Sequence, residues 1–454
     1  MTHESPKSNQ YGCNGSGADV EDSVNVDVMS LSTPGRLRPI SLWRNRDFSV
    51  FWIGETVSQV GTQVTFIALP LVAVLTLDVS AGELGFLRFA EYLPFLAFSL
   101  LFGVWADRRP RRQLMITSYV VRGVLVALVP LLAILGLLQL WTLVMIAFGV
   151  GMGAALFEVC WLSYVPSLVE KDRLVEAMGK MSASHSAAEV AGPGLGGLLV
   201  QLFTAPFVLI VDALSYAVGI LTILQIQRRE PEFHPVGTVP RRPIADLVEG
   251  LRYAFREPHI RATAFSAAMA NFFAVITETV FLLYAVRQLH LSPSLIGLVL
   301  TAVGAGGLVG ALVANVVVRR WPVGRVYVAA RIVTGLAALL IPLAAGPRAV
   351  IVGMFMASLF IGQAALANSN VLNSSLRQAL TPDRLRGRMN ASVRTLVFGV
   401  LPLGGLAAGI LGSSVGLHAT LWVGAIGYAA SILPVLASPI PRLITMPSLA
   451  EGTN

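Results

Sequence analysis

The sequence predicts an all-α integral membrane protein, with twelve transmembrane helices arranged as two parallel six-helix pseudo-repeats. Of its 454 residues, 55% are hydrophobic and only 13% are charged, and the mean hydropathy is +0.71. A typical soluble domain carries about 25% charged residues. The composition therefore excludes a disordered protein, a coiled coil and an ordinary water-soluble enzyme. The length allows about a dozen crossings of roughly 20 apolar residues each.

The N-terminal part of the chain predicts a tail followed by six spans. Residues 1–40 are polar and locally acidic, without the apolar core of a signal peptide, and are expected to form a disordered cytoplasmic tail. The Trp- and Arg-bearing segment 41–47 is an expected interfacial anchor. Residues 41–226 then form the expected N-terminal half. A window of about 20 residues places its spans at about 48–77, 84–106, 113–137, 140–164, 181–203 and 206–226.

A charged stretch at 227–261 separates this half from a second one and is expected to be a cytoplasmic linker. Within it, apolar positions of 244–255 recur at helical spacing, which predicts an amphipathic helix. Residues 262–440 form the expected C-terminal half, and 441–454 a cytoplasmic tail. The same window places the second set of spans at about 262–286, 295–318, 326–346, 349–374, 390–414 and 418–439.

The distribution of basic residues predicts the orientation. With both termini in the cytoplasm, 27 of the 33 Lys and Arg residues fall on inside segments, four fall within spans, and only Arg287 and Arg348 fall outside. This is a strong positive-inside signal, and it supports an even number of spans. The net charge of +8 lies in short strips between apolar runs. It therefore indicates a membrane protein and no nucleic-acid partner. The two cysteines, Cys13 and Cys160, cannot form a disulfide framework or a Cys-rich metal site.

Short matches between the halves indicate a duplication. Residues 103–112 align with 311–320 at an offset of 208, and the Asp-Arg-Leu at 172–174 recurs at 383–385. The Gly- and Pro-rich run at 192–197 is echoed at 402–405. Parallel repeats of this kind imply a pseudo-two-fold axis along the membrane normal, with a binding site near the midplane between the halves.

A loop motif carries the first family resemblance. Gly103, Asp107, Arg108, Arg111 and Arg112 follow the pattern Gly-x-x-x-Asp-Arg-x-x-Arg-Arg between the second and third spans. On this motif the chain resembles the major facilitator superfamily, which implies the major facilitator fold. The glycine is expected to let helices approach closely. The carboxylate is expected to face an arginine, so that the loop latches the halves when the inner gate is closed. A basic loop that only sets topology is the alternative.

The fifth span carries a second motif. Gly192, Pro193, Gly196 and Gly197 match the Gly-x-x-x-Gly-Pro-x-x-Gly-Gly pattern of superfamily antiporters, with Ala188 in place of the first glycine. Small residues at this spacing predict a close helix contact and a kink. In the family the motif accompanies export by proton exchange, and ordinary small-residue packing is the alternative.

A third motif is incomplete. Many drug–proton antiporters carry an arginine in the fourth span that is thought to serve proton transfer, and Ala147 stands at that position here. The segments 58–61, 164–167 and 381–388 resemble the enterobactin-exporter and macrolide-efflux branch. The resemblance covers about residues 41–440.

Ten charged residues fall inside the predicted spans. A charge at mid-bilayer costs about 2.5–3.5 kcal/mol on insertion scales, so each is expected to face a cavity or a partner. The acids are Glu55, Glu91, Glu158, Glu189, Asp212 and Glu278, and the bases are Arg88, Arg122, Arg331 and Arg394. Arg88 and Glu91 are three residues apart on one helix face and are expected to neutralise each other.

Three of these acids are candidates for proton coupling. Glu55, Glu158 and Glu278 lie in the first, fourth and seventh spans, and the resemblance implies that these helices line the central cavity. A proton antiporter needs a carboxylate there that binds either a proton or the substrate, and Glu55 is the first choice. A satisfied polar contact or an interfacial position is the alternative for each. Glu189 ranks lower because it precedes the glycine-proline kink, and His185 is expected to be interfacial.

The predicted function is secondary active export of a small amphipathic molecule, such as a drug, siderophore or specialised metabolite, by proton-coupled alternating access. The chain has no Gly-x-x-x-x-Gly-Lys-[Ser/Thr] loop. The proton motive force is therefore the expected energy source, with no cofactor and no metal. One charge crossing 100 mV is worth about 2.3 kcal/mol.

Two alternatives stay open. One is a proton-coupled importer of a small solute. The other is a membrane-embedded lipid-modifying enzyme, which would need an Asp-rich or His–Asp set that the sequence does not show. The expectation is therefore no enzyme. The expected location is the bacterial inner membrane, and the expected partners are a small-molecule substrate and the lipid bilayer, with the protein itself a monomer.

Overall fold

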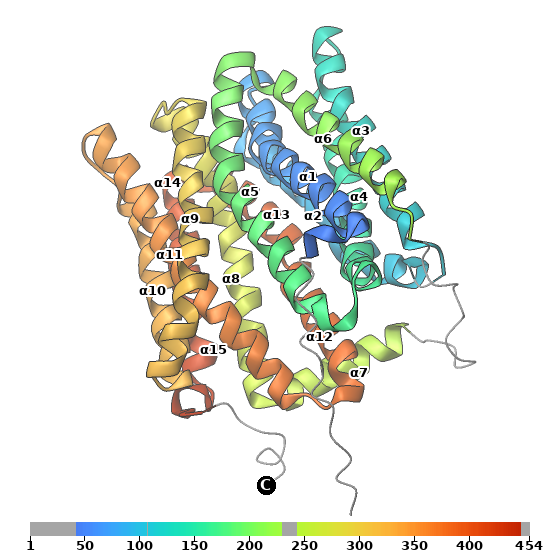
Figure 1. Ribbon diagram of the computed structural model, residues 1–454. Coiled ribbons are helices and arrows are strands. Elements are labelled where there is room, and N and C mark those ends of the chain that lie inside the picture. Colours follow the sequence, from blue (N-terminus) through green and yellow to red (C-terminus); the bar gives the residue numbers. More distant parts are fainter. Residues whose placement is uncertain (1–41, 107, 229–242, 446–454) are drawn as a thin grey trace, which may run out of the picture. The chain divides into compact units, whose positions relative to one another are not determined.

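The computed structural model describes residues 42–106, 108–228 and 243–445, and every regular element within these ranges is a helix (Figure 1). The predicted all-α class is thus confirmed. The tail predicted at 1–40 and most of the C-terminal tail lie outside the described residues, as do Asp107 and the linker residues 229–242.

Six long helices make up the N-terminal half. Its first helix begins where the Asn45 side chain accepts a hydrogen bond from the Phe48 amide, which satisfies one of the free N–H groups of a helix start. A turn with Gly136 at a φ of +66°, a conformation that favours glycine, reverses the chain after the third helix. The six are α1 (Arg46–Leu71), α2 (Ala81–Ala106), α3 (Arg111–Ile134), α4 (Leu140–Leu168), α5 (Leu174–Phe203) and α6 (Ala205–Gln225).

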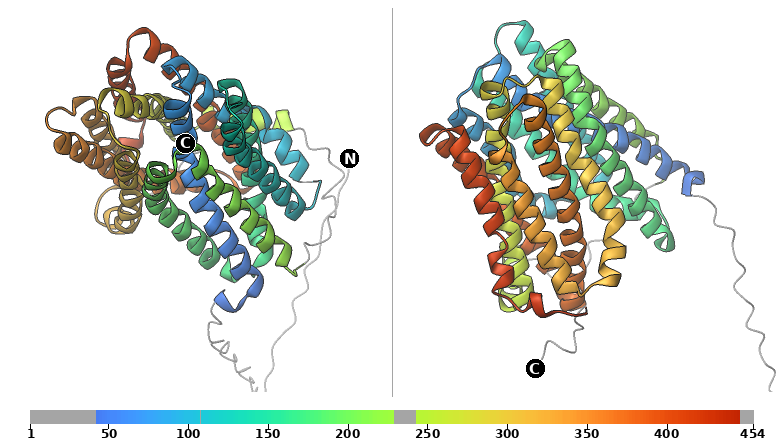
Figure 2. Two further views of the ribbon diagram at one scale, coloured as in Figure 1. Left: turned by 90° about the horizontal axis from the view of Figure 1, so that it is seen from above. Right: turned by 90° about the vertical axis from the view of Figure 1, so that its left-hand side faces the viewer.

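The C-terminal half repeats this arrangement with two interrupted helices. Its elements are α8 (Pro258–Leu283), α9 (Pro293–Arg320), α10 (Val323–Leu343), α11 (Arg348–Leu380), α12 (Asp383–Gly399), α13 (Leu401–Ser414), α14 (Leu417–Ala430) and α15 (Leu433–Leu436). The break between α12 and α13 precedes Pro402, which has no backbone N–H to continue the ladder. In this half α9 packs beside α11, α11 beside α10, and α10 beside α14 (Figure 2).

Ten spans of the described chain are long and apolar enough to cross a bilayer. They include the continuous stretches 384–414 and 417–436, each of which joins two of the helices above. The remaining two helices, α2 and α5, are not among the ten. Both carry charged residues, such as Arg88 and Glu91 in α2 and Glu189 in α5. A multi-pass helical membrane protein is therefore established, and the count of twelve spans stays a prediction.

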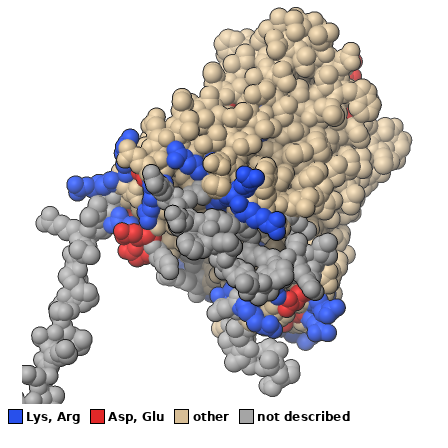
Figure 3. All heavy atoms as spheres, turned by 90° about the vertical axis from the view of Figure 1, so that its right-hand side faces the viewer, with Lys and Arg blue, Asp and Glu red and all other residues tan. Residues whose placement is uncertain are grey.

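The outer surface suits a lipid environment. On α6, Leu214, Leu221 and Leu224 have exposed fractions of 62%, 58% and 56%, and a contiguous apolar surface of this kind needs a partner other than water. On the face seen in Figure 3, the Lys and Arg side chains gather toward one end and most of the remaining surface is uncharged. This is the pattern that the positive-inside count predicts.

The two halves meet at two crossings of glycine against glycine. A Cβ atom added to Gly197 of α5 would lie 2.8 Å from the Cα of Gly297 in α9. One added to Gly85 of α2 would lie 2.5 Å from the Cα of Gly409 in α13 and 2.6 Å from the carbonyl oxygen of Gly405. Gly405 follows Gly197 by 208 residues, and Gly297 follows Gly85 by 212. The crossings are therefore equivalent under the repeat, as a pseudo-two-fold axis requires.

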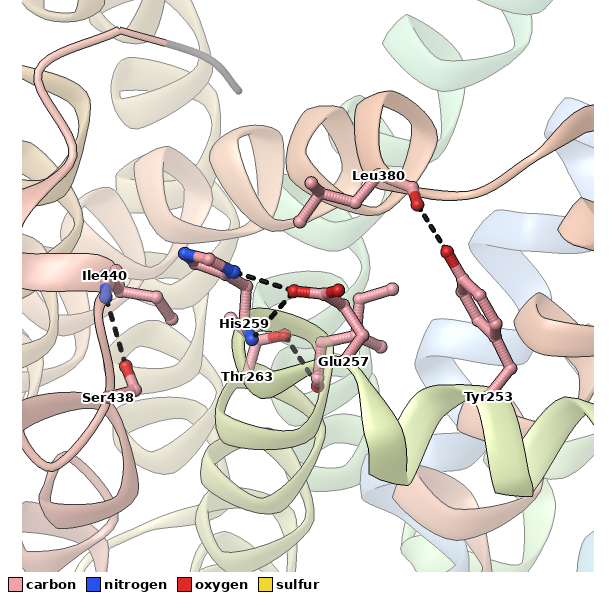
Figure 4. A network of polar contacts seen from close by, with 8 residues as sticks. Tyr253, Glu257, His259, Thr263, Leu380, Ser438 and Ile440 are labelled. Atoms are coloured by element: carbon pink, nitrogen blue, oxygen red, sulfur yellow. Dashed lines mark hydrogen bonds and ion pairs between the residues drawn. The ribbon is translucent and has the colours of Figure 1, made fainter. Parts of the chain in front are cut away.

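The helix α7 (Pro243–Arg256) covers the segment for which the sequence predicts an amphipathic helix, and it packs on the C-terminal half. The Tyr253 hydroxyl donates to the Leu380 carbonyl oxygen over 2.6 Å, close to the start of α8, where Glu257 caps the helix and contacts His259 (Figure 4). Burial raises the pKa of the Tyr253 phenol, so it stays a donor at neutral pH. The Ser392 hydroxyl of α12 donates to the α7 backbone over 2.9 Å. The helix is thus fastened to the end of α11 and to the middle of α12.

Candidate substrate cavity

A cavity of about 930 Å³ lies inside the helical bundle, mostly within the C-terminal half. Helices α8 to α12 and α14 line it, and the N-terminal half contributes only Phe66 of α1 and Glu158 of α4. The volume falls at the upper end of the range for drug-sized ligand pockets. Its charged lining residues are Glu158, Glu278, Arg331, Arg377 and Arg394. Five side-chain amides add neutral polarity: Asn271, Gln363, Asn370, Asn373 and Asn390.

Glu278 forms an ion pair between the two halves. Arg88 of α2 donates to the Glu278 carboxylate of α8 over 2.9 Å and to Glu91 on its own helix over 2.9 Å. The expected pairing of Arg88 with Glu91 is thus present, as part of a larger cluster. The Phe66 ring covers the guanidinium at 5.2 Å. The Glu278 side chain is 36% exposed because it faces the cavity. Two acids share one base, so this cluster can take up one proton and become neutral.

Glu158 forms a second ion pair between the halves. Its carboxylate, on α4, contacts the guanidinium of Arg394 on α12. Both side chains are half-buried and line the cavity. The Arg394 guanidinium also lies over the Phe398 ring at 5.5 Å.

Glu55 lies away from this cavity and is buried within the N-terminal half. Its carboxylate accepts hydrogen bonds of 2.7 Å from the Tyr119 hydroxyl and 2.7 Å from the Gln59 amide. The Gln59 oxygen lies 3.2 Å from His185 Nδ1, and His185 Nε2 lies 3.3 Å from Glu189. Glu55 and Glu189 are therefore linked by one polar chain between α1 and α5, and Tyr119 of α3 extends it beyond Glu55. The half-exposed His185, expected only to be interfacial, is its middle link.

Arg122 and Asp212 belong to a separate buried cluster in the same half. The Asp212 carboxylate accepts from Thr65 over 2.5 Å, and the Arg122 guanidinium donates to Thr62 over 3.1 Å. The guanidinium also lies 4.4 Å from the centroid of the Tyr216 ring. These contacts join α1, α3 and α6.

The loop motif makes contacts within its own half. Arg111 donates to the Ser163 carbonyl oxygen over 3.1 Å and Arg112 to that of Leu224 over 2.9 Å, while Arg108 is exposed. A Cβ atom added to Gly103 would meet no other atom within 4 Å. The expected close helix approach at Gly103 is therefore wrong, because that side of α2 faces open space. Asp107, the acid of the expected latch, lies outside the described residues.

The fifth-span motif does bring helices close together. A Cβ atom on Gly192 would lie 2.3 Å from the Cβ of Gln63, and one on Gly196 would lie 3.3 Å from the Cα of Val64, both on α1. Gly197 faces α9 as described above, and Pro193 lies inside the continuous helix α5. This motif thus packs α5 against α1 on one side and against the other half on the opposite side.

One cavity arginine lies beyond the predicted span 349–374. The apolar run ends before Arg377, so the sequence predicts a cytoplasmic loop at this position. The helix α11 continues to Leu380, and Arg377 lines the cavity. A polar stripe at helical spacing carries the missing signal, because the polar lining positions 363, 370, 373 and 377 all lie on one face of the helix.

Two helical halves that repeat in parallel around a shared cavity define a transporter of the major facilitator superfamily. Within that class the chain belongs to the transmembrane secretion effector family, whose sequence model matches residues 37–450. It is 27% identical over 394 residues to the multidrug efflux pump Tap of Mycolicibacterium fortuitum, covering 84% of this chain and 93% of the relative. It is 19% identical over 282 residues to macrolide efflux protein A of Streptococcus pyogenes, covering 60% and 66%.

The fold is also similar to solved structures. A bacterial homologue of the iron transporter ferroportin, solved in an inward-facing state, superposes with a TM-score of 0.69 at 17% identity, covering 87% of this chain and 99% of that one. The nucleoside transporter NupG superposes with a TM-score of 0.69 at 11% identity, covering 86% and 98%. At these identities the likeness supports the fold alone.

Proposed function

We propose that this protein exports a small amphipathic molecule across the bacterial inner membrane by proton-coupled alternating access, as a monomer with both termini in the cytoplasm. The relatives named as multidrug and macrolide efflux pumps support export. The single observation that carries the coupling is the position of Glu278. Its carboxylate faces the cavity and is also the C-terminal half's partner in an ion pair with Arg88.

The coupling step follows from the charges of this cluster. A proton taken up by Glu278 cancels its charge and weakens its contact with Arg88. Glu91 stays on Arg88, so the buried guanidinium keeps a partner and the large penalty of an unpaired buried charge is avoided. The contact between α2 and α8 is then free to open. Loss of the proton restores the ion pair and draws the halves together again.

The second ion pair acts with the first. Glu158 and Arg394 also join the halves and also face the cavity, so a substrate that competes for either group weakens another cross-half contact. The same side chains thus link substrate binding to the closing of the two halves against each other, as alternating access requires. Glu55, the first choice from the sequence, ranks behind Glu278 because its hydrogen bonds lie within one half.

Cellular accumulation tests this proposal. Macrolides, tetracyclines, a cationic dye and a catecholate siderophore would each be offered to an efflux-deficient bacterial host, with and without a protonophore. We expect lower accumulation of at least one compound, abolished by the protonophore and by Glu278→Gln. The matched control is Glu176→Gln, which removes a surface carboxylate on α5 outside the cavity. Higher accumulation of a compound would establish import and overturn the proposal.

A further inference from the structure

Two arginines of the cavity lack an acidic partner. Arg331 of α10 and Arg377 of α11 both line it, and no ion pair joins either to a carboxylate in the described part of the chain. The other charged lining residues each have a partner of opposite charge, since Glu278 pairs with Arg88 and Glu158 with Arg394. Two arginines without a carboxylate partner therefore lie on neighbouring helices of the cavity wall, which we name the basic face (Tyr327, Arg331, Asn373 and Arg377).

Neutral groups hold the first arginine in place. Arg331 is 5% exposed, and its guanidinium donates to the Ser431 hydroxyl over 2.5 Å and to the Ser266 carbonyl oxygen over 3.5 Å. The ring of Tyr428 lies 5.8 Å from the guanidinium carbon. The Nε atom of Arg331 is buried and has no hydrogen-bond partner. The side chain is thus fixed in position without being neutralised.

The second arginine completes the face. The Nε atom of Arg377 is also buried without a partner. The side chain of Asn373, one turn earlier on α11, lines the same cavity. Tyr327 lies four residues before Arg331 on α10 and lines the same cavity. Buried polar atoms of this kind are uncommon in folded proteins and indicate a missing partner. That partner has to supply negative charge to two guanidinium groups.

We propose that the basic face binds the anionic group of an amphipathic substrate, a carboxylate or a similar oxyanion, whose apolar body packs against Phe281, Ile341 and Leu359 of the same cavity. A guanidinium group matches a carboxylate with two parallel donors, and a charge-assisted contact of this kind is stronger inside a cavity than in water. This inference rests on the proposed export function and names its substrate class.

A pair of probes that differ in one charge tests the inference. N-dansyl-leucine carries a carboxylate, and N-dansyl-leucinamide has the same body without charge. Binding of each to the full chain in phosphatidylcholine nanodiscs would be followed by fluorescence anisotropy. We expect the acid to bind about tenfold more tightly than the amide. Equal affinities, or no binding of the acid, would overturn the inference without any variant.

Variants then locate the preference. Arg331→Gln and Arg377→Gln should each reduce the acid's affinity about tenfold and leave the amide's affinity unchanged. Arg377→Lys keeps the charge and should retain most of the preference. The matched control is Arg325→Gln, which removes an exposed arginine of α10 outside the cavity. An acid preference that persists in both Gln variants would place the anion elsewhere and overturn the assignment.

Two further arms separate the outcomes. If nanodiscs that contain phosphatidylglycerol abolish acid binding, the occupant is a lipid headgroup and the substrate assignment fails. Protonophore-sensitive efflux in cells without an acid preference in nanodiscs would overturn this inference and leave the export function standing. An acid preference in nanodiscs without efflux of any compound would support the binding of an anion and overturn the export function.

Discussion

Arg88 and Glu278 join the two halves of the protein through a 2.9 Å ion pair in the wall of the substrate cavity. The pair stands beside a backbone crossing, since the Cβ atom of Arg88 is 3.1 Å from the position that a Cβ on Gly405 would take. The ion pair between Arg88 and Glu278 thus lies next to the close packing of Gly405 against α2. Under the proposed coupling, protonation of Glu278 would therefore weaken a contact between the halves beside one that stays packed.

Substitution of Glu278 by Gln should uncouple transport from the proton gradient. The amide cannot take up or release a proton, so we expect protonophore-sensitive efflux to fall at least tenfold, while exchange of labelled for unlabelled substrate continues. Efflux and exchange would be measured in the same proteoliposomes. Wild-type efflux with an unchanged pH profile in this variant would show that coupling lies elsewhere, and Glu55→Gln would then be the next variant.

Substitution of Arg88 by Gln should cost more stability than substitution of either acid. It leaves two carboxylates near each other without their common base, and removal of one member of a buried pair costs about 3–5 kcal/mol. The thermal unfolding temperature in detergent should fall clearly. Adding Glu278→Gln to Arg88→Gln should recover part of the loss. A strictly additive double variant would show that the 2.9 Å contact contributes no coupling energy.

The two glycine motifs should respond in opposite ways. Gly197→Leu places a side chain where a Cβ atom already lies 2.8 Å from the Gly297 backbone, so the halves cannot approach and transport should be lost. Gly103→Ala meets open space and should leave transport intact, with stability unchanged or raised by up to about 1 kcal/mol through helix propensity. Both variants would be compared for expression, unfolding temperature and efflux. Loss of efflux in Gly103→Ala would reveal a contact made in another conformation.

The attachment of α7 depends on one measurable hydrogen bond. Tyr253→Phe removes the hydroxyl that donates to Leu380 and should cost about 0.5–1.5 kcal/mol. Hydrogen exchange of the α7 amides should accelerate in this variant, while exchange in α3 stays unchanged as the internal reference. Equal protection of α7 in both proteins would show that α12 alone holds the helix.

Much of the fold could be predicted because membrane crossing imposes a strong local pattern on the sequence. The apolar runs gave the helices, and the offset between repeats anticipated the equivalence of Gly197 and Gly405. The number of spans is less secure, because α2 and α5 are not among the ten stretches that are long and apolar enough to cross a bilayer.

The site was only partly predictable, because partners from other helices decide the role of a charged residue. The sequence locates Glu55 in the first helix, but not that Tyr119 and Gln59 occupy its carboxylate. It separates Glu158 from Arg394 by more than two hundred positions, and only the packing of the halves brings them together. Arg377 was not predicted to face the cavity, because the apolar run ends before it while helix α11 continues to Leu380 along the cavity wall.

The glycine crossings also bear on the phospholipids around the protein. At Gly197 with Gly297 and at Gly85 with Gly409 the backbones touch, so at these levels no acyl chain can slip between the halves. A hydrophobic compound dissolved in a leaflet cannot enter by these two seams. In this conformation, a lipid that reached the cavity would have to enter at another level of the interface.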